Sequence, residues 1–82
     1  MGFTGPEGSG RPGIYYFKKA VKAFDKDQYA FAIDMYEVSA SWAYKPAQYN
    51  LSVMYARGHG VPVDLPRAAA WIALAAERGD SR

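Results

Sequence analysis

Two segments of the chain repeat the same order of large and small apolar residues, 36 positions apart. Leu65 corresponds to Tyr29 and Ala68 to Ala32, and the rest of each segment keeps this register. Within each segment the apolar residues recur every three or four positions, as on one face of a helix. A repeat of about 34–36 residues is typical of helical hairpins that stack on one another. The repeat therefore predicts that these segments are equivalent helices of two successive hairpins.

Apolar residues at helical spacing predict four helices after residue 13. Pro46 interrupts the pattern, and because the residue before a proline avoids helical geometry, Lys45 marks a boundary. No alternating β-branched run competes, so we expect an all-α fold of two helix-turn-helix repeats. Its four antiparallel helices would form a short segment of right-handed α-α superhelix. The expected apolar stripes are Tyr16, Phe17, Ala20, Val21 and Phe24; Tyr29, Ala32, Ile33, Tyr36 and Ala40; Ala47, Leu51, Met54 and Tyr55; and Leu65, Ala68, Ala69, Ile72, Ala75 and Ala76, with Gly79 as a C-terminal cap.

Residues 1–13 differ in composition from the rest, because they hold five of the eight glycines and two of the five prolines. Such a segment buries too little apolar surface to offset its ordering entropy, so we expect a flexible tail. An expression-vector origin for part of it stays open. It has neither the apolar centre of a secretory signal nor the pattern of a transit peptide.

Composition narrows the possible partners and locations. The net charge of +2 is too small to indicate nucleic-acid binding, and the lysines at positions 18, 19, 22 and 26 are interpreted as a solvated helix face. No apolar run approaches the roughly 18 residues of a membrane span, so we expect no membrane insertion. The absence of cysteine excludes disulfides but leaves the compartment open between cytoplasm and periplasm.

No constellation of catalytic or metal-ligating residues emerges from the pattern. His59 is the only histidine, and a metal site would need partner ligands. Asp34 and Glu37 lie three positions apart but suit catalysis only inside an apolar cleft, so both are interpreted as surface residues. We therefore expect a protein that is not an enzyme and that carries no cofactor and no metal.

The second half of the chain carries a motif with many fixed spacings, and it resembles a Sel-one-like repeat, a relative of the tetratricopeptide repeat. Ser52 departs from the pattern, since the family usually has glycine there. The first half resembles a degenerate tetratricopeptide hairpin, so we divide the chain into residues 14–45 and 46–82. The matching residues are Ala47, Leu51, Tyr55, Gly58, Gly60, Val61, Asp64, Ala68, Trp71, Ala75, Ala76 and Gly79 in the second half, and Tyr29, Ala32, Ile33, Tyr36 and Ser39 in the first.

The Gly-His-Gly loop of this motif has a structural interpretation. Gly58 would end the third helix in a left-handed conformation, and Gly60 would let the chain reverse. Val61 would pack back over the helices, and Asp64 would accept hydrogen bonds from free amides at the start of the fourth helix. His59 would then point into solvent as an ordinary loop residue.

The resemblance implies a concave groove lined by the first helix of each hairpin. The candidates are Tyr16 and Lys19, with Lys22 less central, on the first helix and Tyr49, Asn50, Val53 and Arg57 on the third. Asn50 corresponds to a position that holds a peptide backbone in tetratricopeptide repeats, although a hydrogen bond within its own repeat is the alternative. Lys19 and Arg57 would favour an acidic peptide or a C-terminal carboxylate.

A second candidate surface lies at the end of the second hairpin. The stripe Phe31, Met35, Val38 and Trp42 should pack against the following repeat, and its counterpart in the second repeat is Arg67, Trp71, Leu74 and Arg78. Trp71 and Leu74 would then meet a further repeat, a partner or a second copy. The alternative is that Trp71 lies inside its own repeat.

These observations favour a non-enzymatic module that binds a protein or peptide partner. The resemblance implies a bacterial adaptor or scaffold. The alternative is a structural or self-associating piece of a longer array, since about three repeats are usually needed for a continuous core.

Overall fold

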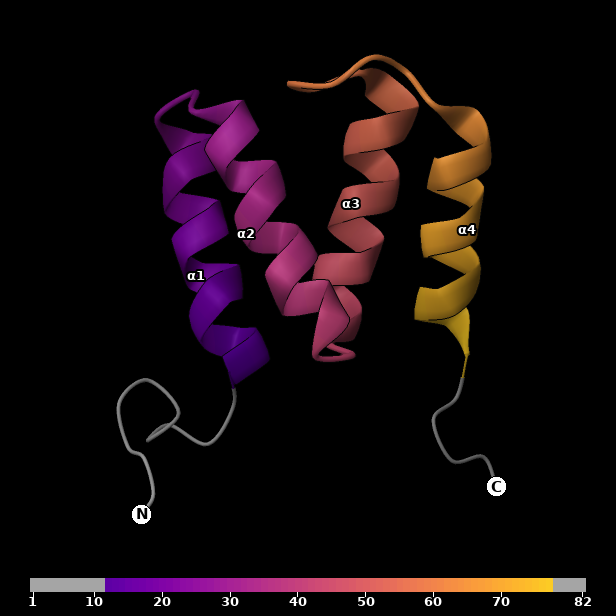
Figure 1. Ribbon diagram of the computed structural model, residues 1–82, viewed down its shortest axis with the longest axis horizontal. Coiled ribbons are helices and arrows are strands. Elements are labelled where there is room, and N and C mark those ends of the chain that lie inside the picture. The colour runs from indigo at the N-terminus through magenta and orange to yellow at the C-terminus, as the bar shows by residue number, and fades with distance from the viewer. Residues whose placement is uncertain (1–11, 78–82) are drawn as a thin grey trace.

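The computed structural model describes residues 12–77, which form two helical hairpins side by side (Figure 1). α1 and α2 form the first hairpin, α3 and α4 form the second, and α2 and α3 meet in the middle. No strand occurs in this range, which confirms the all-α prediction. The expected tail up to residue 11 and the Gly79 cap lie outside the described residues. The helices are α1 (Pro12–Asp25), α2 (Tyr29–Ser41), α3 (Lys45–Arg57) and α4 (Leu65–Ala76).

α1 begins two residues earlier than the sequence pattern predicts. Pro12 suits the first turn of a helix, where its missing N–H would have had no partner. Gly13 is buried, and the Ser39 hydroxyl donates a hydrogen bond to its carbonyl (2.5 Å). A Cβ at this position would lie only 2.8 Å from Cβ of Tyr44. The first turn of α1 is therefore fixed against the end of α2 and is not part of a tail.

Small residues allow the helices to pack closely. Ala20, Ala32, Ala47 and Leu51 are fully buried, and alanine at a crossing point lets two helix backbones approach. Phe17 adds an aromatic contact with the ring of Tyr36, at 5.6 Å between centroids. The other core residues are Ala23, Ile33, Tyr36, Ala40, Met54, Tyr55 and Ala68.

The two hairpins are joined through α2 and α3, and one expectation about this contact is wrong. Gln48 of α3 donates a hydrogen bond to the carbonyl of Ala40 on α2 (3.2 Å). The stripe Phe31, Met35, Val38 and Trp42 does not pack against α3 as a unit, because Phe31 and Trp42 are 47% and 58% exposed; Val38 is half-buried, and Met35 packs against the core. Successive residues turn by about 100° along a helix, so this stripe lies on the side of α2 opposite Ala40.

α4 packs through only part of the predicted stripe. Ala68 is buried, Trp71 is half-buried against the core, and Ala75 is half-buried. Leu65 and Ile72, which belong to the predicted inward stripe, are 61% and 40% exposed, and Ala69 and Ala76 of that stripe are also exposed. Because α4 is apolar around most of its circumference, its sequence pattern does not specify which face meets α3.

None of the helices between residues 12 and 77 combines the length and the hydropathy of a membrane span.

Candidate functional site

A groove of about 510 Å³ lies between the two hairpins. α3 supplies most of its wall, and four predicted groove residues lie together there. The structure adds residues from α1, α2 and the loop after α3, so the groove depends on how the hairpins are joined. The lining residues are Tyr49, Asn50, Val53, Met54 and Arg57 on α3, Phe24 on α1, Tyr36 on α2, and His59 in the loop.

The structure does not bring the predicted α1 residues into this groove. Lys19 lines a separate hollow with Lys22, and its ammonium group lies 5.4 Å from the centroid of the Tyr15 ring. Tyr16 is half-buried beside Tyr15. Phe24 is the α1 residue that lines the groove, and at about 100° per residue Lys19 lies nearly on the opposite side of the helix. The helical pattern already places Phe24 and Lys19 on different sides of α1. Only the packing of the two hairpins shows which of these sides faces the groove.

Asn50 lines the groove together with Tyr36 of the first hairpin. It is half-buried, whereas Tyr36 is buried. Burial raises the pKa of Tyr36, the Asn50 side chain lowers it, and the Asp25 carboxylate raises it further. The amide thus lies at the junction of the two repeats and has donor and acceptor capacity for a ligand.

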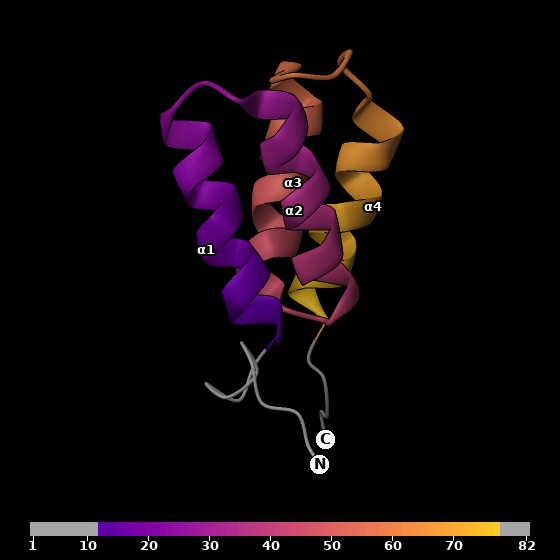
Figure 2. The same ribbon diagram turned by 60° about the vertical axis from the view of Figure 1, so that its left-hand side comes forward.

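The loop after α3 extends from the end of that helix towards the turn that joins α1 and α2 (Figure 2). Gly58 adopts a left-handed conformation (φ 75°), and its N–H bonds to the carbonyl of Met54 (2.8 Å), as predicted. Gly60 has the same φ, and a Cβ there would lie 2.5 Å from Cβ of Tyr29. Val61 packs against the core, which confirms that expectation. The loop therefore closes against the first hairpin.

The expectation that His59 points into solvent is wrong. Its ring is stacked on Tyr29, with 5.7 Å between centroids and 20° between planes, and it also lies 5.6 Å from the ring of Phe24. The close approach of Gly60 to Tyr29 brings the histidine onto these rings. His59 is half-buried and lines the groove beside Arg57.

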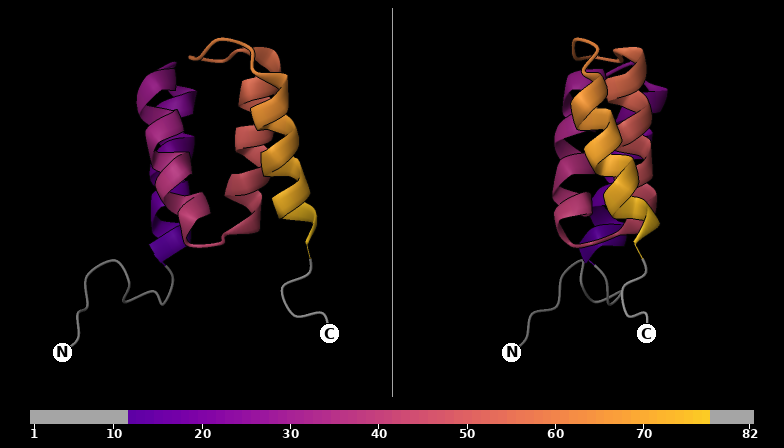
Figure 3. Two further views of the ribbon diagram at one scale, coloured as in Figure 1. Left: turned by 45° about the vertical axis from the view of Figure 1, so that its right-hand side comes forward. Right: turned by 90° about the vertical axis from the view of Figure 1, so that its right-hand side faces the viewer.

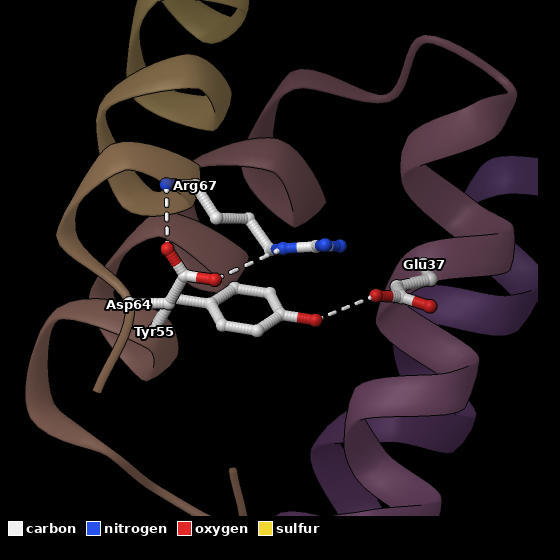
Figure 4. A network of polar contacts seen from close by, with 4 residues as sticks. All are labelled: Glu37, Tyr55, Asp64 and Arg67. Atoms are coloured by element: carbon white, nitrogen blue, oxygen red, sulfur yellow. Dashed lines mark hydrogen bonds and ion pairs between the residues drawn. The ribbon is translucent and has the colours of Figure 1, made fainter. Parts of the chain in front are cut away.

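A polar network on another side of the molecule links the hairpins (Figure 4). Asp64 caps α4 by accepting a hydrogen bond from the Arg67 N–H (3.1 Å), which confirms its predicted role. The Arg67 guanidinium lies 5.3 Å from the centroid of the Tyr55 ring, and the Tyr55 hydroxyl donates to Glu37 (2.8 Å). Burial and the bond to Glu37 raise the pKa of Tyr55.

The two carboxylates considered as a pair, and the potential metal ligands, lie apart among the described residues. Asp34 is exposed, whereas Glu37 is half-buried and accepts the bond from Tyr55, so the two carboxylates do not share an apolar cleft. Between residues 12 and 77, no three potential His, Cys, Asp or Glu ligands are grouped closely enough to hold a metal ion.

The residues of the predicted end surface lie in different surroundings. Trp71 packs against the core, while Leu74 is 39% exposed and its carbonyl accepts a hydrogen bond from the Lys45 ammonium (3.0 Å). Ile72 lines an apolar hollow of about 400 Å³ together with Lys45, Pro46, Tyr49, Ala75 and Ala76. The exposed apolar surface of α4 is therefore centred on Ile72 and not on Trp71.

Comparison with known proteins agrees with this architecture. The family model described as Sel1 repeat matches residues 11–23 and 45–80, well over half of the chain. The matched parts include most of α1 and the whole second hairpin with its Gly-His-Gly loop. Neither the curated proteins nor the solved structures contain a significant match. The chain belongs to the Sel1 repeat family.

Proposed function

We propose that this Sel1 repeat protein is a non-enzymatic adaptor whose groove binds an extended peptide segment of a protein partner. The observation that carries the proposal is the groove itself, which both hairpins build around a half-buried amide, Asn50. Its lining combines aromatic and aliphatic side chains with few polar groups, the usual composition of a ligand site. The resemblance of the sequence favours a bacterial adaptor or scaffold.

Each groove residue has a distinct role in this proposal. Asn50 can donate to and accept from the same peptide unit, which fixes an extended backbone. Tyr49 is 54% exposed and offers a large apolar surface with a polar tip, so it can cover a ligand side chain. Arg57 is exposed at the end of α3 and can bind a carboxylate of the ligand through two parallel hydrogen bonds.

Selection from a random peptide library, followed by calorimetric titration of the selected peptide, tests the proposal. Asn50→Ala should weaken binding about tenfold, the effect of losing hydrogen bonds worth about 1.4 kcal/mol. Arg57→Glu should weaken the binding of acidic peptides further. Lys19→Glu is the matched control, because Lys19 is exposed but lines a different hollow. Equal affinities of the wild type and Asn50→Ala, with Lys19→Glu impaired, would contradict the groove assignment.

A second candidate function is self-association or assembly within a longer array. Its supporting observation is the apolar surface of α4, where Leu65 and Ile72 lie on one side of the helix and are 61% and 40% exposed. Exposed apolar side chains that gather on one element are typical of interaction surfaces. A homodimer would form through this surface and would leave the groove available.

A further inference from the structure

The exposed face of α4 corresponds to the face through which α2 packs on α3. At the repeat distance of 36 positions, Tyr36 corresponds to Ile72 and Ala40 to Ala76. Tyr36 and Ala40 are 4% and 3% exposed because α3 and the core cover them. Ile72 and Ala76 are exposed, and α4 lies at the end of the row of helices, where it packs against α3 (Figure 3). α4 thus presents the surface on which a helix equivalent to α3 would lie.

α1 presents the complementary surface at the other end of the molecule. Residues 11–23 and 45–57 correspond at a distance of 34 positions, with Pro12 at the place of Pro46, and the family model matches both segments. In this register Gln48 corresponds to Ile14 and Tyr55 to Val21. Gln48 and Tyr55 are buried and bond to α2, whereas Ile14 and Val21 are only half-buried.

The residues that would meet differ from the internal contact in a matched way. Between α2 and α3, Glu37 accepts a hydrogen bond from Tyr55. At the equivalent places on α4 and α1 stand Ala73 and Val21, so both members of the polar pair are replaced by apolar residues. An unpaired carboxylate or hydroxyl would be costly to bury in such a contact, and neither is present at these positions.

In the contact between Gln48 and Ala40 only the donor changes. Gln48 bonds to the backbone carbonyl of Ala40, and its counterpart Ile14 has no donor, while Ala76 stands at the place of Ala40. Ile72 stands at the place of Tyr36, so the centre of the α4 face is aliphatic. The side chains of Glu37, Tyr55 and Gln48, which form the internal polar contacts, thus all have apolar counterparts on the two open faces.

We propose that copies of this chain stack head to tail, with α1 of one copy lying on α4 of the next as α3 lies on α2. The contact joins two different surfaces, so each copy keeps one face open and further copies can be added. The occupant of the α4 face is therefore a second copy of this chain. The proposal deepens the second candidate function and is independent of the groove, so Asn50→Ala should leave the stacking unchanged.

Two variants that each close one face test the proposal. Ile72→Glu places a charge on the α4 face, and Ile14→Glu places one on the α1 face. Light scattering after size-exclusion chromatography, over a wide concentration range, gives the mass of each species. The wild type should grow from monomer to dimer and larger species as concentration rises, and each variant alone should stay monomeric. An equimolar mixture should form a dimer that does not grow, because one intact face remains on each variant.

Leu74→Glu is the matched control. Leu74 lies on the same helix as Ile72 and is as exposed, at 39% against 40%, but it is two residues further on and thus about 200° around the helix. It should leave the association of the wild type unchanged. If Ile72→Glu does not retain the helical circular dichroism of the wild type, Ala76→Glu closes the same face at an already exposed position.

Three results would overturn the proposal. The first is a wild type that stays monomeric at every concentration, which would leave the α4 face to a different partner. The second is a mixture of the two variants that does not pair. The third is dissociation by Leu74→Glu with no effect of Ile72→Glu, which would place the contact on another face.

Discussion

Replacing Gly60 by alanine should destabilise the chain much more than the same replacement at Gly58. Both glycines have φ of 75°, a conformation that costs a residue with a Cβ about 1–2 kcal/mol. The two positions differ in what the new methyl group would meet. At Gly58 the nearest atom is Cγ2 of Val63, at 3.0 Å, which belongs to a side chain that can rotate.

At Gly60 the methyl group would lie 2.5 Å from Cβ of Tyr29 and 3.1 Å from its backbone carbonyl carbon. Because these atoms are fixed in the first turn of α2, the loop itself has to move. That movement separates His59 from Tyr29, an aromatic contact worth about 0.5–1.5 kcal/mol. It also exposes part of half-buried Val61, at about 1 kcal/mol. We therefore expect a loss of about 3–4 kcal/mol for Gly60→Ala, against about 1–2 kcal/mol for Gly58→Ala.

Urea unfolding followed by far-ultraviolet circular dichroism measures both values. A domain of this size has a total stability of only about 5 kcal/mol or somewhat more, so Gly60→Ala should be close to unfolding at room temperature. Equal losses for the two variants would refute the reasoning, because they would show that the loop does not depend on close packing against Tyr29.

Three further predictions concern the N-cap of α4 and the tyrosines Tyr36 and Tyr55. Asp64→Ala should lower the free energy of unfolding by about 1 kcal/mol because the N-cap bond of α4 is lost, while Asp64→Asn should retain most of it; urea unfolding compares them. Tyr55→Phe should lower the free energy of unfolding by about 1–1.5 kcal/mol, because Glu37 loses its hydrogen-bond donor while the ring stays packed. A loss below about 0.3 kcal/mol, the error of such a comparison, would mean that water replaces the lost hydroxyl. The pKa values of Tyr36 and Tyr55 are raised in the folded chain, so their contribution to the free energy of unfolding should be fully present below pH 10.0, the ordinary tyrosine pKa. This contribution should be lost as pH rises through the higher folded pKa values, because the unfolded chain loses these protons first. Tyr55→Phe should flatten that alkaline fall in urea titrations, and an unchanged slope would contradict the assignment to Tyr55.

The features that the sequence predicts correctly are those decided within a few residues. A glycine after a helix and an aspartate before one act through hydrogen bonds to nearby backbone, so Gly58 and Asp64 could be assigned their roles from local pattern alone. The start of α3 is predicted to within one residue from Pro46, but Lys45 is the first helical residue and does not avoid helical geometry as expected.

The features that sequence reasoning missed depend on how the helices are rotated against one another. Phe24, and not Lys19, lines the groove, and Ile72 is exposed on α4 while Trp71 packs against the core. A helix that is apolar on more than one face offers several packing solutions, and only the partner helix selects one. His59 was missed for a related reason, since its contact with Tyr29 is set by the distance between the two hairpins.

The central claim, that the groove between the hairpins binds a peptide, is tested most directly by nuclear magnetic resonance. Amide signals of the ¹⁵N-labelled chain would be followed during titration with the peptide selected from the library. The account predicts that the largest shifts fall on Asn50, Val53, Arg57 and His59, with small shifts at Lys19. Shifts confined to α4, or to the hollow that contains Lys19 and Lys22, would contradict it.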